Sequence, residues 1–212
     1  MILNDLVVLE QPSSAKFTKA LATVATVLHP AFDALLPTKG KSKESCVLCS
    51  ATVRDFLWKV GFKDAKMTTV YLAFRATDAN GVEVHSAGVG DHASGRVPLA
   101  PGVDFSERRG YWNGHMVVEV PSQATIIDTT LFHMKRPQWP LLPGMMAVPI
   151  FEGPPSFGME QVSAISFDQE NGNMLHMWWV REPNPSWRNA PDYTDRALRL
   201  PVVRAMRAAF RA

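Results

Sequence analysis

Residues 115–128, which read HMVVEVPSQATIID, contain two runs of β-forming residues with a turn signal between them. The runs HMVVEV and ATIID are rich in apolar and β-branched residues, and Pro121 and Ser122 favour a tight connection. If the loop is symmetric about these two residues, His115 lies directly opposite Asp128 on the partner strand. The stretch therefore predicts an antiparallel hairpin that brings a histidine and an aspartate together.

Directly opposed side chains of a hairpin share one face of the sheet, with Cβ atoms about 4.5–5.5 Å apart. At that separation a carboxylate can accept a hydrogen bond from one imidazole nitrogen and fix the orientation of the ring. We therefore expect a ring nitrogen of His115 to lie about 2.6–3.2 Å from an oxygen of Asp128. The other ring nitrogen then faces a third group, unless an odd shift of the register separates the two residues.

Cys46 is the candidate for this third group. Residues 45–60, SCVLCSATVRDFLWKV, follow helical spacing, and Gly61 is suited to end the helix. Cys46 falls in the first turn, where the helix dipole and unpaired amides stabilise a thiolate and can form part of an oxyanion hole. Cys49 lies one turn further along, where this effect fades. Cys46 and the predicted histidine–aspartate pair are together typical of a cysteine-nucleophile enzyme.

Each of these residues also has an alternative interpretation. Free cysteines are usually small buried residues, a strand histidine often binds a backbone carbonyl, and an aspartate often caps a turn. The Cys46-x-x-Cys49 pair could be a thioredoxin-like redox pair, although a lysine-rich loop and not a strand precedes it. The pair could also bind zinc, but the sequence lacks the compact histidine pair that such sites use. The histidines considered as zinc ligands are His85, His92, His115 and His133.

A longer series of motifs contains the three residues in order. The series consists of Cys46-x-x-x-Ser50-Ala51, Gly61-Phe62, Gly114-His115-Met116-Val117-Val118-Glu119-Val120 and Ile127-Asp128-Thr129-Thr130. It covers roughly 45–130 and resembles the transglutaminase-like superfamily of papain-like Cys-His-Asp enzymes. That superfamily includes microbial transglutaminase-like peptidases and, more distantly, arylamine N-acetyltransferases. The sequence departs from the usual family residues at Val117, often an aromatic residue, and at Thr129, often a proline.

The resemblance implies a role for each residue. Cys46 would be the nucleophile, His115 the general base and later the acid, and Asp128 the residue that orients the histidine. A thioester would pass its acyl group to water or an amine, so the substrate would be a peptide, a protein or a small acyl compound. Trp112 and Asn113 would bind this substrate, and no metal or other cofactor would be needed. The alternatives are a non-catalytic binding protein on the same fold and a Cys-x-x-Cys zinc or redox protein.

Helical patterns precede β-type patterns along the chain, which predicts an α+β fold with N-terminal helices packed on an antiparallel sheet. The length of 212 residues and the hydrophobic content of 46% fit one globular domain over 1–212. We expect its core at 45–130, with a C-terminal hairpin and a basic helix at 144–212 as an extension. The resemblance makes this the transglutaminase-like or papain-like cysteine-enzyme fold.

The N-terminal helix is predicted over residues 15–28. Ser13 and Ser14 can cap it, and its apolar residues recur at helical spacing. The pair His29-Pro30 should end or bend this helix, because a proline disfavours helical backbone in the residue before it. A second short helix is expected to follow.

Charge and hydropathy limit the expected partners. The net charge of +2 gives no support for binding to nucleic acid. The sequence has no uninterrupted apolar run of about 18 residues, and its first residues do not form a signal-type segment. We therefore expect a cytoplasmic protein that binds neither nucleic acid nor a membrane, and the sequence leaves its oligomeric state open.

Overall fold

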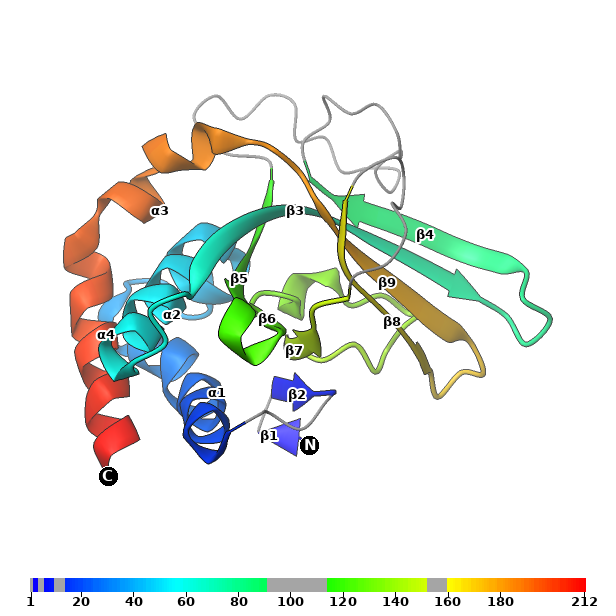
Figure 1. Ribbon diagram of the computed structural model, residues 1–212. Coiled ribbons are helices and arrows are strands. Elements are labelled where there is room, and N and C mark those ends of the chain that lie inside the picture. The colour runs from blue at the N-terminus through cyan, green and yellow to red at the C-terminus, as the bar shows by residue number, and fades with distance from the viewer. Residues whose placement is uncertain (1, 4–5, 10–13, 91–113, 152–159) are drawn as a thin grey trace.

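The computed structural model describes residues 2–3, 6–9, 14–90, 114–151 and 160–212. Helices and one curled sheet form an α+β fold, which confirms the class predicted from the order of the sequence patterns (Figure 1). The long helices gather on one side of the sheet, and the chain ends in a helix on that side.

The sheet contains nine strands among the described residues. They are β1 (Ile2–Leu3), β2 (Leu6–Val8), β3 (Lys66–Thr77), β4 (Glu83–Val89), β5 (His115–Val120), β6 (Thr125–Asp128), β7 (Met145–Pro149), β8 (Gln161–Asp168) and β9 (Met174–Arg181). Their order is β1-β2-β7-β6-β5-β3-β9-β8, and β4 pairs with β3. The expectation of a purely antiparallel sheet is wrong in one detail, because β2 runs parallel to β7 and makes the sheet mixed.

The long α-helices cover one side of this sheet. The α-helices are α1 (Ala15–Leu35), α2 (Cys46–Val60), α3 (Pro191–Thr194) and α4 (Arg196–Arg211). Short 3-10 helices are η1 (Lys41–Glu44), η3 (Pro121–Gln123), η4 (Phe132–Met134) and η5 (Pro185–Asn189). Ser45 caps α2, and Gly61 ends it with a φ of 109°, as the sequence predicts. Cys46 is therefore the first residue of a long helix.

The first helix is longer than the predicted 15–28 and does not end at His29-Pro30, the first of the two outcomes expected there. Helix α1 passes through Pro30 and continues to Leu35, so the expected second helix is its last turns. Leu28 and Phe32, on either side of the proline, are both fully buried. Burial of these side chains in one core offsets the backbone hydrogen bond that the proline cannot make.

The two faces of the sheet pack into two separate hydrophobic cores. On β5, Val118 faces the core shared with α1, α2 and α4, whereas Val117 faces the core enclosed by the curled sheet. On β6, Ile127 and Ile126 divide between the two cores in the same way. This alternation follows from the two-residue period of a strand, and it defines a helix face and an inner face.

The hairpin of β5 and β6 has a longer loop than predicted. Val120 pairs with Thr125, so residues 121–124 form the loop and the register differs by two residues from the expected one. Direct opposition of His115 and Asp128 is therefore wrong. Because the displacement is even, both side chains still lie on the same, inner face of the sheet.

The C-terminal segment contributes to the same sheet and the same helix layer. Strand β9 pairs with β3 along its length, from Val70 opposite Arg181 to Thr77 opposite Met174. Helix α4 packs on α1 and α2, with Met206 fully buried between them. The centre of the sheet thus combines strands that are far apart in the sequence.

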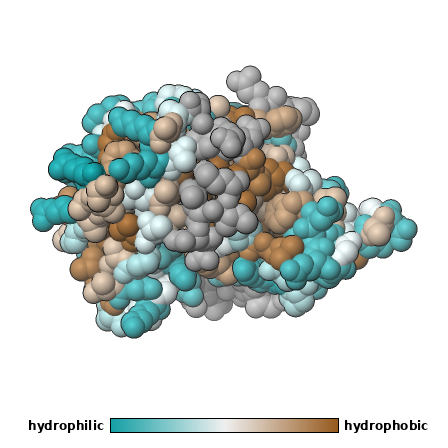
Figure 2. Space-filling model, turned by 90° about the horizontal axis from the view of Figure 1, so that it is seen from below, coloured by the Kyte–Doolittle hydropathy of each residue, from teal (hydrophilic) through white to brown (hydrophobic). Residues whose placement is uncertain are grey.

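The molecular surface mixes polar and apolar residues. On the face shown in Figure 2, hydrophobic side chains are interspersed with hydrophilic ones. Within the described ranges, no helix has both the length and the apolar character needed to cross a membrane.

The loop of the β5–β6 hairpin generates a stability prediction. Ala124 is the only described residue other than glycine with a positive φ, at 44°. This backbone costs an alanine roughly 1–2 kcal/mol, which glycine avoids at the expense of more chain entropy. We expect Ala124→Gly to raise the free energy of unfolding by about 0.5 kcal/mol in urea denaturation. The control is Ala79→Gly, in an exposed turn without positive φ, which should lower the free energy of unfolding. Equal changes of the unfolding free energy in the two variants would contradict the interpretation.

Candidate functional site

Cys46 lies where α2 meets the start of β5. The Ser45 hydroxyl caps α2 by accepting the backbone N–H of Leu48 at 3.4 Å, and it donates to the carboxylate of Asp192. The Cys46 side chain is half-buried, with Sγ 3.8 Å from the carbonyl oxygen of Gly114. The first amides of a helix have no partner within the helix, so this thiol sits at an electropositive position.

The imidazole of His115 lies between Cys46 and Asp128. Its Nε2 is 2.7 Å from Oδ2 of Asp128, so the predicted hydrogen bond is present. Cys46 lies close enough to the His115 ring to help raise its pKa. Because Nε2 is already engaged, Nδ1 is the nitrogen available to the thiol. The structure therefore brings the three residues of the predicted triad into one array.

Three donors hold the carboxylate of Asp128, which is completely buried. Oδ2 accepts from His115 and, at 2.9 Å, from the indole N–H of Trp179. Oδ1 accepts from the backbone N–H of Thr130 at 3.2 Å. The sequence did not predict the contact of Trp179, which lies 51 positions from Asp128. The order of strands in the sheet brings β9 to this site, and no local sequence pattern indicates that order.

The charges of this array favour a protonated histidine beside an ionised aspartate. Burial alone would lower the pKa of His115, but the charge and hydrogen bond of Asp128, with a contribution from Cys46, raise it to about 10. Burial would raise the pKa of Asp128, but His115 and the donors Trp179 and Thr130 hold it below its usual value. A protonated imidazole next to a cysteine stabilises the thiolate form.

Cys49 has a different environment one turn further along α2. It is completely buried, and its thiol donates to the carbonyl oxygen of Ser42 at 3.1 Å. Burial, followed by the charges of Cys46 and Asp192, raises the pKa of this thiol well above its usual value. Cys49 therefore stays protonated at neutral pH, and Cys46 is the better placed of the two free thiols for nucleophilic attack.

His29 of α1 forms hydrogen bonds to two segments next to the candidate site. Its Nε2 lies 3.0 Å from the carbonyl oxygen of Thr129, and its Nδ1 lies 2.9 Å from Oγ of Ser42. A carbonyl oxygen only accepts, so Nε2 carries a proton and donates to it. This buried histidine connects the residue that follows Asp128 with the 3-10 helix that precedes α2.

The two predicted substrate-binding residues, Trp112 and Asn113, lie outside the described residues. A different tryptophan, Trp187 of η5, belongs to a small buried cluster against which Cys46 packs. The C-terminal segment thus places an aromatic side chain near the thiol. The sequence did not predict this contact, because no local pattern connects η5 with the start of α2.

The cysteines and histidines are the candidate ligands for a metal ion. Among the residues that the structure describes, no group of three or more His, Cys, Asp or Glu side chains is arranged to hold a metal ion. His92 lies outside those residues, and His85 packs against the ring of Trp139 with centroids 5.3 Å apart.

Comparison with known proteins found no matching family model, no significantly similar curated protein and no significantly similar solved structure. The function is therefore inferred from the chemistry of the site.

The indole of Trp179 is the basis of the first prediction about this site. Trp179→Phe keeps an aromatic ring but removes a donor to a buried carboxylate, which should cost roughly 1.5–3 kcal/mol of unfolding free energy. Trp178→Phe is the matched control, because the neighbouring Trp178 is only half-buried and its side chain points to the opposite face. Urea denaturation of both variants measures the difference, and an equal loss would show that the indole N–H does not support Asp128.

The His115–Asp128 pair predicts a pH dependence of stability. Because folding raises the His115 pKa from 6.5 to about 10, its stabilisation is complete below pH 6.5 and is lost as the pH rises toward 10. Because folding lowers the Asp128 pKa from 3.8, its stabilisation is present above that pH and is lost in stronger acid. Between pH 6 and pH 9, urea denaturation should show a larger loss of stability in the wild type than in His115→Gln. Parallel losses would contradict the assignment.

Proposed function

We propose that this protein is a cysteine-nucleophile enzyme that transfers an acyl group, from an amide or a related acyl bond, through a thioester on Cys46. The observation that carries the proposal is the contiguous array of Cys46, His115 and Asp128. Its imidazole lies beside the thiol, which helps to raise the pKa of the ring, and it is hydrogen-bonded at 2.7 Å to a buried carboxylate. A nucleophile, a base and a group that orients the base are the minimal set for this chemistry.

Each residue has one task in the proposed reaction. Before substrate binds, His115 already holds the proton of the Cys46 thiol, and the resulting thiolate attacks the carbonyl carbon of the substrate. The free amides at the start of α2 stabilise the negative oxygen that forms. His115 then protonates the leaving group, which leaves a thioester on Cys46. Water or an amine attacks this thioester with His115 again as the base, while Asp128 keeps the ring oriented and stabilises its charge.

The finer assignment to the transglutaminase-like superfamily is part of this proposal. It is supported by a helix that begins at Cys46 and ends at Gly61, and by a strand that begins at His115. It is also supported by the position of Asp128 at the end of the next strand. A peptide, a protein or a small acyl compound is the proposed substrate, and the cytoplasm the proposed location.

Acylation by p-nitrophenyl acetate tests the proposed reaction. The Cys46 thiolate should displace p-nitrophenolate and gain one acetyl group, which intact-mass spectrometry detects and peptide mapping locates. We expect Cys46→Ser to reduce p-nitrophenolate release by about a thousandfold or more. Asp128→Asn should reduce it less, because an amide still positions the imidazole but cannot stabilise its charge.

Cys49→Ser is the matched control for this experiment, because Cys49 lies on the same helix but is enclosed in the core. It should retain acylation at Cys46. Acylation of Cys49 in preference to Cys46, or no acylation of either, would reject the enzyme and favour a binding protein. If the purified protein holds one equivalent of zinc and loses it when both cysteines are replaced by serine, the zinc alternative is favoured.

A further inference from the structure

An open groove of about 670 Å³ lies where β3, the end of β9 and η5 meet. It is lined by residues 66–69 of β3, by residues 181–185 at and after the end of β9, by Glu160, and by Trp187 and Arg188 of η5. Its volume is within the range of sites that bind small organic ligands. None of the three residues of the proposed triad lines this groove.

Two residues connect this groove with the thiol of the candidate site. Met67 and Trp187 line the groove, and both also belong to the cluster of apolar side chains against which Cys46 packs. Apolar side chains therefore connect the groove with the residue proposed to carry the acyl group. The groove and the thiol thus share one cluster of apolar side chains, while His115 and Asp128 are themselves buried.

The charged residues at the groove are balanced in sign, with the cations Lys66, Arg181 and Arg188 against the carboxylates of Glu119, Glu160 and Glu182. Arg188 lies over the Trp187 ring, with its Cζ 5.4 Å from the ring centroid. Lys66 lies 3.0 Å from the carboxylate of Glu119, and Arg181 lies 3.3 Å from the same carboxylate. Arg181 also lies 3.2 Å from the carboxylate of Glu160. Cations that already have carboxylate partners gain little from a charged ligand. The groove therefore favours a ligand without net charge.

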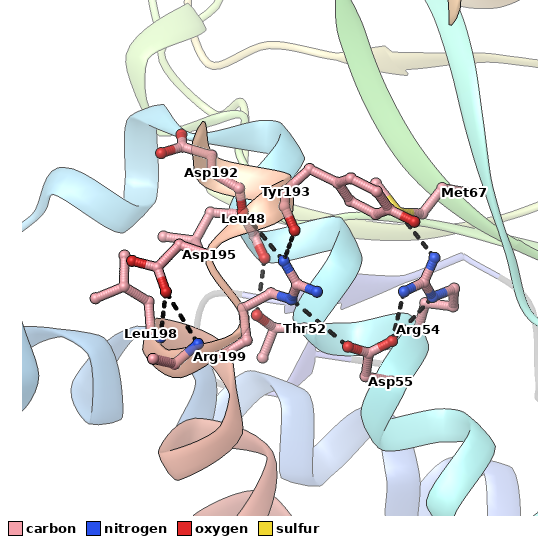
Figure 3. A network of polar contacts seen from close by, with 11 residues as sticks. Leu48, Thr52, Arg54, Asp55, Met67, Asp192, Tyr193, Asp195, Leu198 and Arg199 are labelled. Carbon is pink, nitrogen blue, oxygen red and sulfur yellow. Dashed lines mark hydrogen bonds and ion pairs between the residues drawn. The ribbon is translucent and has the colours of Figure 1, made fainter. Parts of the chain in front are cut away.

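The part of the groove nearest Cys46 is apolar and fixed in position. Figure 3 shows Arg54 of α2 directed at Met67, with Nη1 3.4 Å from Sδ, and at Asp55, with Nη2 2.6 Å from Oδ1. The ring of Tyr193 also lies beside Arg54, with its centroid 5.8 Å from Cζ. A half-buried methionine is usually mobile, but here the guanidinium limits where its sulfur can lie.

Trp187, the second apolar residue, is held by a chain of contacts from α4. Arg199 is 2% exposed and donates to the backbone carbonyls of Asp192, at 3.3 Å, and of Tyr193. The ring of Tyr193 packs edge-on against Trp187, with centroids 4.7 Å apart. Helix α3 is thereby fixed beside η5, and the indole forms a rigid wall of the groove.

From this shared cluster, this charge balance and this apolar wall we infer that the groove binds the acyl part of the substrate, and that this acyl part is uncharged and apolar. This inference rests on the proposed function, since it assigns the group that Cys46 carries. Met67 and Trp187 contact the acyl chain and determine its size, while the acyl carbonyl lies at the thiolate.

A series of p-nitrophenyl esters, the acetate, the butyrate and the hexanoate, tests the inference. In each case a bond forms between Sγ of Cys46 and the acyl carbon, and the bond to p-nitrophenolate breaks. Rates are divided by those of free N-acetylcysteine, which removes the intrinsic reactivity of each ester. The normalised hexanoate rate should exceed the acetate rate by about tenfold or more, because each methylene removed from water strengthens binding by roughly fourfold.

Met67→Trp should fill the groove beside the thiol and reduce this hexanoate-to-acetate ratio to about one. The matched control is Met174→Trp, which makes the same change at a half-buried methionine at the far end of β9 and should leave the ratio as in the wild type. Trp187→Phe, which keeps the fold better than an alanine, should lower the ratio by a smaller factor.

The rate of alkylation by iodoacetamide separates the inference from the function on which it rests. If Cys46 is alkylated and acylated rapidly but the ratio is near one in the wild type, the groove is not an acyl site and the enzyme proposal stands. A ratio that Met67→Trp leaves as high as in the wild type also overturns the inference. If Cys46 reacts with none of the esters, the proposed function itself fails.

Discussion

The buried carboxylate of Asp128 is the constraint on which the rest of the site depends. A carboxylate without solvent must receive hydrogen bonds or a positive charge, because its desolvation otherwise costs several kcal/mol. Here the donors are a ring nitrogen from β5, an indole from β9 and a backbone N–H from the residues after β6. One charged group thus fixes the relative positions of two strands and a loop, and it holds His115 in the orientation that faces Cys46.

The remaining half of the site comes from the helix layer. The hydroxyl of Ser50, fully buried on α2, donates to the carbonyl oxygen of Met116 at 3.0 Å. This bond joins α2 to β5 one turn after Cys46 and one residue after His115. His29 joins α1 to the segment after Asp128. The thiol and its base are therefore positioned by hydrogen bonds between the two layers as well as by hydrophobic packing.

Polar contacts between distant segments recur on the other side of the thiol. Arg54 and Arg199 each satisfy groups from separate elements, and together they hold α3 against α2 (Figure 3). Because α3 and η5 carry the aromatic residues near Cys46, the C-terminal segment shapes the surroundings of a residue that lies early in the chain. A site built in this way is destabilised by loss of a contact far from the thiol.

The sequence by itself determined the local structure and the identity of the candidate residues. Helical spacing, with Ser45 and Gly61 at its ends, placed Cys46 at the start of a helix. The two-residue period of a strand placed His115 and Asp128 on one face of the sheet, although the loop between them is longer than predicted. Only the tertiary structure decided the mixed sheet, the contact of Trp179 with Asp128 and the position of Trp187 near Cys46. The reason is physical: capping, turn chemistry and periodicity act over a few residues, whereas the order of strands in a sheet depends on how separate segments bury their apolar surfaces together.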